Sequence, residues 1–541
     1  MTTVIATRTG LPVSKADVHV SVLDRLAFGA CVADRKALET MGFQGWLDEQ
    51  LTGDHRQDPD AEMRIRNATL HVKYGSNATN DYPAVDELRP LRTLGQSITE
   101  TWKLLDADPK MAPPPERGRP WVEVAAATLI RSVYSRWQLR EVLVDFWHNH
   151  FNVNAAGDQT VAVSLPSYDR DVIRRHALGN FRDFLEAVAT SAAMQVYLNN
   201  RSSRAGNANE NYGRELFELH TLGRDNYFNA IYDKWRKVPG AIQGRPIGYI
   251  DQDVYEAARA FTGWTIEDGA GIGPGQSLPK TGKFAYVESW HDNYQKRVLG
   301  TEFDPFQAPM ADGRKVLDLV ANHPATAHFV CFKLCRRLVA DEPAESLVAG
   351  AAAVWTQNRK HPDQIARTVR FITTSAAFAD SKGAKVKRPL ETAASFVRAT
   401  GIDFTPTEAL IYEMAGGGQK LFGWAPPTGH PDTRDYWLST NAMRHRWTLA
   451  LGLADNYWQT GTFDPVALMG ESDPVAISVM QFWRQRLLPD SDPAIEAKLL
   501  ATMKMAPDQR LSSIPGNPKD QKAPFRHIVA YLAMSPGFQM R

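Results

Sequence analysis

The sequence predicts an all-α fold: one large helical domain over residues 1–541, with long Gly/Pro-rich inserted loops and at most short hairpins. Three observations predict it. Apolar residues recur at helical spacing along most of the chain, no run of strands is long enough for a central sheet, and no tandem repeat has a fixed period. Gly- and Pro-rich stretches separate the helical patterns. We therefore expect loop insertions near 106–120, 236–252, 266–300 and 416–437.

The helical patterns follow one another along the chain. Residues 20–51 form two helices divided at Gly29 and Gly42, and His323-Pro324 has the form of a helix start because Pro is tolerated in the first turn. Further helices are predicted over 85–105, 121–150, 181–198, 209–222, 253–262, 312–340, 344–357, 362–378, 388–400 and, with a polar break at 512–522, over 439–541. Short hairpins are compatible with the 240–300 region.

Composition excludes several classes of protein. The formal net charge is +1, without the basic excess of a nucleic-acid binder, so no nucleic-acid partner is expected. Three cysteines are too few for a disulfide framework. No apolar run approaches the roughly 20 residues of a membrane span. Met1 to Val22 lacks the pattern of a signal peptide, so we expect a cytoplasmic protein, or one exported with a signal-bearing partner.

The strongest functional signal is the helix that begins near Asn209. At about 100° per residue, one face carries Glu210, Asn211, Arg214, Glu215, Glu218 and Thr221. Arg214 is four residues from both Glu210 and Glu218 and can pair with either carboxylate. Two interpretations stay open. The face is a solvated salt-bridged surface, or it is a row of carboxylates whose pKa values are pushed apart for acid–base work or for a divalent ion. His220 falls in the apolar arc and is expected in the core.

A second polar group is His148-Asn149-His150 with Asn152 and Asn154. In a continuous helix, His148 and His150 diverge by about 200° and cannot share a metal ion. If the helix ends near His148, then His150, Asn152 and Asn154 line one face of an extended segment. Structural capping of the helix end and a role in a site are both compatible with this pattern.

A third group is His291-Asp292, in a segment expected to be a loop, where one side chain can act while the other orients a neighbour. Standard catalytic motifs are absent. The sequence has no phosphate-binding loop, no Gly-x-Ser-x-Gly elbow and no His-Glu-x-x-His. The reaction class therefore has to be argued from the polar groups themselves.

An ordered set of motifs resembles a known family. It includes Arg25-Leu-Ala-Phe-Gly29, Phe146-Trp-His-Asn-His-Phe151, Asn209-Glu-Asn-Tyr-Gly-Arg-Glu-Leu216, Ala258-Arg-Ala-Phe-Thr-Gly-Trp264, His323-Pro-Ala-Thr-Ala327 and Lys387-Arg-Pro-Leu-Glu391. The chain resembles the bacterial family of domain of unknown function 1800. The resemblance implies a single helical domain of about this length. It also places Glu210, Arg214 and Glu215 with His148, His150, His291 and Asp292 among the recurrent polar positions, which favours a shared cleft.

Two hypotheses follow. In the first, the protein is an enzyme with hydrolytic or eliminative action on a polar polymer such as a glycan. Glu210 and Glu218 are then the acid–base residues, Arg214 binds a substrate anion, and His150 and His291 carry protons. The substrate-binding residues are Trp147, Asn149, Asn211, Trp264 and Trp424, the tryptophans as stacking surfaces beside Tyr294. In a metal-assisted form, His291, Asp292 and Glu210 hold a divalent ion.

The second hypothesis is a non-catalytic role. Many members of the resembling family are exported and are encoded near sulfatase-like proteins of unknown-function family 1501. The resemblance therefore implies an escort or assembly partner of such a sulfatase-like protein. In that case the same polar groups form a buried structural network, paired with one another and sealed from solvent.

Overall fold

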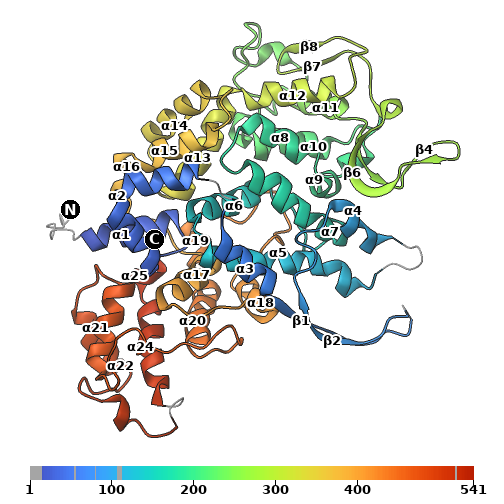
Figure 1. Cartoon of the computed structure of the whole chain (residues 1–541). Coiled ribbons are helices and arrows are strands. Elements are labelled where there is room, and N and C mark those ends of the chain that lie inside the picture. The colour runs from blue at the N-terminus through green and yellow to red at the C-terminus, as the bar shows by residue number, and fades with distance from the viewer. Residues whose placement is uncertain (1–14, 54–55, 80, 107–111, 518–520) are drawn as a thin grey trace. The chain divides into compact units, whose positions relative to one another are not determined.

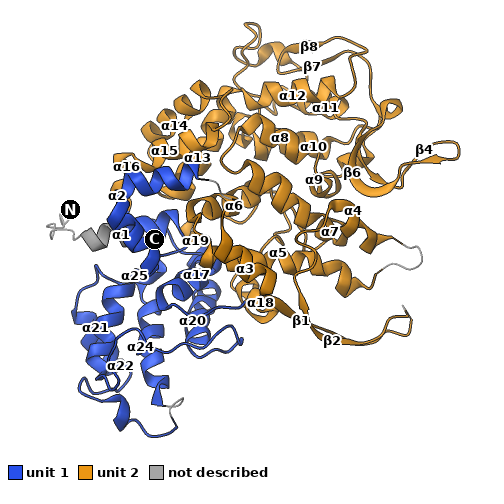
Figure 2. Cartoon of the chain, in the orientation of Figure 1, with its two compact units in different colours: residues 1–53, 382–405, 437–541 blue, residues 54–381, 406–436 orange. Residues whose placement is uncertain are grey.

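The chain divides into two compact units, each discontinuous in sequence (Figure 2). Unit 1 comprises Met1–Gly53, Lys382–Thr405 and Trp437–Arg541, and unit 2 comprises Asp54–Ser381 and Pro406–Tyr436. The computed structural model describes residues 15–53, 56–79, 81–106, 112–517 and 521–541, with side chains from Ser21 onward. The first residues of the Met1 to Val22 segment, where the sequence pattern predicts no signal peptide, lie outside these residues. Part of the predicted 106–120 loop also lies outside them. The prediction of one domain over 1–541 stays a prediction.

Unit 1 is built from helices (Figure 1). Gly29 ends the first of them, and the second is kinked at Gly42, so both predicted breaks are confirmed. Its helices are α1 (Lys15–Leu26), α2 (Val32–Thr52), α17 (Pro389–Thr400), α20 (Thr440–Ala454), α21 (Ala476–Leu487), α22 (Ala494–Thr502), η8 (Leu511–Ser513), α24 (Ala523–Met534) and α25 (Pro536–Gln539). Helix α20 packs against α17 and α24, and the buried Arg398 of α17 donates to the Gly29 carbonyl and pairs with Asp34.

Unit 2 is also predominantly helical. Its helices are α3 (Pro59–Asn67), α4 (Ile98–Trp102), α5 (Pro114–Tyr134), α6 (Gln138–His150), α7 (Gln159–Ser167), α8 (Phe181–Ala189), α9 (Ala192–Tyr197), α10 (Glu210–Glu215), α11 (Asp251–Ala260), α12 (Ala311–Ala321), α13 (Pro324–Leu338), α14 (Glu345–Gln357), α15 (Gln364–Thr373), α16 (Ala376–Ala379) and α18 (Glu408–Gly416). Helices α13, α14 and α15 lie side by side (Figure 1). His323 caps α13 by accepting the Ala325 N–H, as the His-Pro pattern predicted.

Shorter segments join these helices. They are the 3₁₀ turns η1 (Lys103–Leu105), η3 (Asn200–Ser202), η5 (Arg224–Asn226), η6 (Trp235–Lys237) and η7 (Glu288–Trp290), and the π-helical η2 (Tyr168–Arg174) and η4 (Leu216–His220). The short α19 (Arg434–Trp437) lies where the sequence passes from unit 2 into unit 1. None of the helices in the described part of the chain is both long enough and apolar enough to cross a membrane.

Strands form four antiparallel pairs within the described residues, all in unit 2. The pairs are β1 (Thr69–Tyr74) with β2 (Val85–Pro90), β3 (Trp264–Asp268) with β6 (Lys280–Tyr286), β4 (Gly271–Gly273) with β5 (Gln276–Ser277), and β7 (Lys296–Val298) with β8 (Thr301–Phe303). The last three pairs are short hairpins of the kind that the sequence allowed around 240–300.

Several predicted helices were wrong in their extent, and those predicted over 181–198 and 362–378 are each divided in two. The predicted helix over 85–105 is instead β2 followed by α4, because Pro90 is incompatible with a helix interior and Ser97 and Glu100 form a capping box that starts a new helix. The helix predicted over 121–150 is interrupted between Tyr134 and Gln138. It also begins earlier, since α5 starts at Pro114, within the Pro-rich stretch that was expected to be a loop.

A buried ionic network links α6 to η2. Asp169 accepts from His148 Nε2 at 2.9 Å and from Arg174 Nε at 2.8 Å, and Arg174 Nη1 also donates to Glu141 at 2.8 Å. The charge of Arg174 and the His148 hydrogen bond hold the pKa of Asp169 well below its usual range, against the opposing effect of burial. His148 is therefore engaged on the side of α6 away from His150.

The substitution Asp169→Asn tests this network. Removing one member leaves the buried Arg174 charge undercompensated, so we expect a loss of about 3 kcal/mol in the free energy of unfolding. Urea denaturation followed by circular dichroism measures it. Asp171→Asn is the matched control, because Asp171 is exposed and pairs with its neighbour Arg170; it should change stability by less than about 0.5 kcal/mol. Equal effects of the two substitutions would contradict the assignment.

Candidate functional site

The site is built around the helix predicted from Asn209. The Asn209 side chain caps α10 by accepting the Asn211 N–H at 3.0 Å. Gly213 lets α10 approach α11, since a Cβ there would lie 3.0 Å from the Val254 carbonyl oxygen. After Glu215 the α-helix changes to the π-helix η4, whose turn is wider. Wider helical turns of this kind occur frequently at functional sites.

The apolar arc of this helix agrees with the sequence pattern. Tyr212, Leu216 and Phe217 are buried, and His220 is only 1% exposed, as predicted for a core histidine. Thr221 departs from the pattern. It was expected on the polar face, but it is buried and donates to the Leu216 carbonyl, because the chain leaves helical geometry there.

Arg214 and Glu210 belong to a surface network. Arg214 Nη2 donates to Asp251 at 3.0 Å and to Glu210 at 3.4 Å, and the Tyr227 hydroxyl donates to the same Asp251 oxygen. Glu210 is exposed, and Asn211 bonds the Leu198 carbonyl. The arginine predicted to bind a substrate anion is thus already engaged by carboxylates, and Glu210 lies on the open surface.

Glu215 and Glu218 lie deeper than Glu210. Both are partly buried, and within the described residues no hydrogen bond or ion pair reaches the Glu215 carboxylate. Burial, together with the charge of Glu218, raises the pKa of Glu215 to about 7, although Arg214 opposes the shift. Glu218 is 23% exposed and lies 3.7 Å from Arg224 Nε. The sequence analysis placed Glu215 on the polar face but did not select it as catalytic.

Two tyrosines interact electrostatically with this pair. Tyr249 is fully buried, and its hydroxyl has no hydrogen-bond partner in the described parts of the chain. Burial and the charge of Glu218 raise its pKa. Tyr197 of α9 donates to the Ala425 carbonyl at 2.6 Å, and burial raises its pKa to about 12 with a smaller effect from Glu215. Neither tyrosine was selected from the sequence, since both come from segments distant in the chain.

Two neutral histidines and a lysine form the next part of the site. His150 Nε2 donates to the His220 carbonyl at 3.1 Å, and the two rings are 6.2 Å apart. Burial, followed by the charge of Lys333, lowers the pKa of His220 to about 3 and also lowers that of His150. Burial lowers the pKa of Lys333 itself to about 8, against the charge of Asp432. His150 and His220 are therefore neutral at physiological pH.

The loop over 422–432 is anchored to the end of α6. Asn149 Nδ2 donates to the His430 carbonyl at 2.9 Å, and the His430 N–H donates back to Asn149 Oδ1 at 2.7 Å. Gly429 has a φ of 71°, and a Cβ there would lie 2.1 Å from the Asn149 carbonyl oxygen, so only glycine fits. Asn152 donates to the carbonyl of Trp424, whose partly exposed ring lies 4.7 Å from that of His430.

Two predicted stacking surfaces are instead core residues. Trp147 and Trp264 are both 0% exposed, so neither ring offers a face to a substrate. Trp147 packs among Phe151, Phe181 and Phe184 and donates its indole N–H to the Ala177 carbonyl at 2.9 Å. Their apolar rings pack in the core. The position of a tryptophan in the sequence does not by itself distinguish packing from a binding role.

His291 and Asp292 form a separate network. His291 bonds the Thr262 carbonyl through Nδ1 at 2.8 Å and Asp312 through Nε2 at 3.3 Å, whereas Asp292 accepts two hydrogen bonds from Arg259. Lys296 completes it by donating to Asp312 at 2.7 Å. The predicted metal ligand set of His291, Asp292 and Glu210 is not assembled, and no group of three or more His, Cys, Asp or Glu side chains in the described residues has metal-binding geometry.

Comparison with known proteins identifies the family. A family model described as protein of unknown function (DUF1800) matches residues 21–540, nearly the whole chain. The chain belongs to the DUF1800 family. No curated protein and no solved structure matches it. The matched residues include α10 and η4, the end of α6 and the His291 network.

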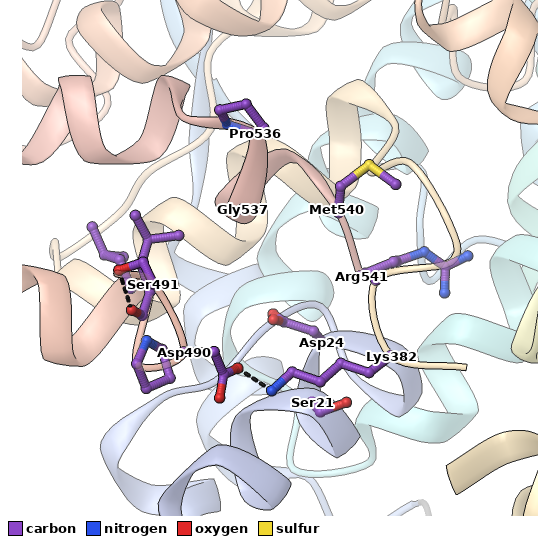
Figure 3. A pocket seen from close by; sticks show the side chains of 13 residues that line it. Ser21, Asp24, Lys382, Asp490, Ser491, Pro536, Gly537, Met540 and Arg541 are labelled. Atoms are coloured by element: carbon purple, nitrogen blue, oxygen red, sulfur yellow. Dashed lines mark hydrogen bonds and ion pairs between the residues drawn. The ribbon is translucent and has the colours of Figure 1, made fainter. Parts of the chain in front are cut away.

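This DUF1800 chain has a further cavity in unit 1, of about 610 Å³ (Figure 3). Its charged lining residues are already paired. Lys382 pairs with Asp490 across it, Asp24 pairs with Lys387 at 3.2 Å, and Arg541 pairs with Glu391 at 3.2 Å. It contains none of the residues predicted for the site, and Glu215, whose carboxylate has no hydrogen-bond or ion-pair partner in the described residues, is in unit 2.

The ionisation of Glu215 predicts a pH-dependent stability. The folded chain binds this proton more tightly than the unfolded chain does, so the free energy of unfolding falls as pH rises from about 4.5 towards 7 and the cost persists above 7. Glu215→Gln removes the cost. Relative to wild type, the variant should gain about 2 kcal/mol more at pH 8 than at pH 5 in urea denaturation. Glu210→Gln, at an exposed position, should match wild type at both pH values; a pH-independent gain for Glu215→Gln would refute the assignment.

Proposed function

We propose that this protein is an enzyme that cleaves a polar polymer such as a glycan, by hydrolysis or elimination, with Glu215 and Glu218 as its acid–base pair. The observation that carries the proposal is the Glu215 carboxylate, partly buried beside Glu218 and without a hydrogen-bond or ion-pair partner in the described residues. Unpaired carboxylates in such places are costly, and proteins keep them where chemistry needs them.

The two carboxylates suit opposite roles. Glu215, with its raised pKa, holds a proton near neutral pH, whereas Glu218, which lies 3.7 Å from Arg224 Nε, acts as the base. In hydrolysis, Glu215 gives its proton to the leaving oxygen of the glycosidic bond, and Glu218 takes a proton from the attacking water. In elimination, Glu218 takes the proton from carbon and Glu215 again protonates the leaving oxygen. Glu215 thus replaces Glu210 as the acid in the proposal.

The surrounding groups favour a sugar ring. The partly exposed Trp424 supplies a stacking face, and Asn149, Asn152 and Tyr197 hold its loop in place. The buried Tyr249 hydroxyl has no hydrogen-bond partner in the described residues, and the charge of Glu218 acts on it. No metal-dependent step is assigned, because Glu210, His291 and Asp292 are engaged in separate pairs.

The escort hypothesis predicts a different state for these polar groups from the one that an enzyme needs. It requires the polar groups to be paired and sealed, as His291, Asp292 and Lys296 are. Glu215 and Lys333 lack ion pairs in the described residues and stay partly exposed. Such groups contribute nothing to a structural network, so the enzyme is the better supported proposal over a non-catalytic partner of a sulfatase-like protein.

Substitution of the acid tests the function. On a panel of glycans, Glu215→Gln should lower kcat by about 10²–10⁴-fold, since a positioned proton donor contributes an effect of that size, with KM little changed. Product release from each polymer is the measurement. Glu210→Gln should retain wild-type kcat. Turnover by Glu215→Gln at the wild-type rate would rule out the acid–base pair.

A further inference from the structure

Lys333 is a cation in an unusual setting. It lies on α13, partly buried, and in the described residues its ammonium makes no ion pair and no hydrogen bond. Its ammonium lies over the Phe329 ring, whose centroid is 5.4 Å from Nζ. A half-buried ammonium without a protein partner keeps its hydrogen-bonding capacity and its charge for an incoming anion.

No carboxylate in the described residues lies within ion-pair distance of the Lys333 ammonium. His150 of α6 and His220 of η4 are neutral, Arg336 on the same helix is a second cation, and Asp432 contributes an opposing charge at a longer range than an ion pair. Burial lowers the pKa of Lys333 to about 8, which still leaves it mostly protonated at neutral pH. The local field therefore favours an incoming anion.

Lys333 is also connected to the proposed acid–base pair. His220, whose pKa Lys333 depresses, ends the same π-helical segment that carries Glu218. The Phe329 ring, whose centroid is 5.4 Å from Lys333 Nζ, lies 6.4 Å from the ring of His150, and His150 donates to the His220 carbonyl at the end of η4. Asp432, whose charge acts on Lys333, lies two residues after His430, and His430 contacts the Trp424 ring. Lys333 is therefore joined to η4 by a short chain of contacts.

We propose that Lys333 binds the anionic group of an acidic sugar, so that the substrate is a glycan carrying carboxylate or sulfate groups. This inference rests on the proposed function and names its substrate class. It also moves the anion-binding role from Arg214, whose guanidinium is occupied by Asp251 and Glu210, to Lys333. A neutral glycan would leave this half-buried ammonium without a charged partner.

Binding to three oligosaccharides of equal length tests the proposal: one of uronic acids, one sulfated and one neutral. Isothermal titration of the full-length wild type should show tighter binding of at least one acidic ligand, and the better of the two identifies the anion. Lys333→Met should lose about ten- to hundredfold in affinity for that ligand and nothing for the neutral one. Lys333→Arg should keep the preference, as should Lys280→Met, which removes an exposed lysine of β6.

The pH dependence supplies a second readout. As pH rises from 7 to 9.5, Lys333 loses its proton and the acidic preference of the wild type should fall, whereas Lys333→Met should show no such change. Because Lys333→Met removes a buried cation, it should fold at least as stably as wild type, and thermal denaturation checks this.

The outcomes test the role of Lys333 and the acid–base pair separately. Equal binding of acidic and neutral ligands by wild type, binding of none of them, or an undiminished preference in Lys333→Met overturns the inference. Glu215→Gln separates it from the proposed function, since this variant should bind with the acidic preference but lose turnover. If Glu215→Gln turns substrate over while Lys333→Met loses the preference, the acid–base pair fails and Lys333 stands; the reverse result removes Lys333 alone.

Discussion

The change from α- to π-helix at Leu216 is the constraint on which the site depends. The chain has to bury Leu216, Phe217 and His220 on one side while it keeps Glu215 and Glu218 together on the other. A wider turn over 216–220 satisfies both demands at the cost of regular hydrogen bonding. It also directs the His220 carbonyl to His150, which joins this helix to the end of α6. The acidic pair and the histidine pair are thus products of one local departure from helical geometry.

Local signals in the sequence were sufficient for much of the fold. Gly29, Gly42 and His323-Pro324 mark helix boundaries by their own backbone preferences, and the structure has boundaries there. The β1–β2 pair was missed because the partner of a strand lies elsewhere in the chain, although Pro90 argued against the helix predicted across it. The break between α5 and α6 was missed for a similar reason, since apolar spacing continues through both helices.

The site was predicted in its main helix and not in its partners. The angular pattern separated polar from apolar residues of the 209–222 segment correctly for most positions. It could not show that Asp251 engages Arg214, or that the charge of Lys333 acts on His220, because those residues come from α11 and α13. Burial also decides between two roles that look the same in sequence: Trp147 and Trp264 pack in the core, whereas Trp424 stays partly exposed.

The contrast between two polar groups of unit 2 argues most strongly for where the chemistry takes place. Around His291, the charges of Asp292, Asp312 and Lys296 are matched by partners at hydrogen-bond distance. In the described residues Glu215 has no hydrogen-bond or ion-pair partner and Lys333 has no ion pair, although both are partly buried. The charges around His291 are neutralised within the fold, whereas Glu215 and Lys333 lower its stability because they are not. This loss of stability is explained if a bound substrate supplies the proton acceptor for Glu215 and the anion for Lys333.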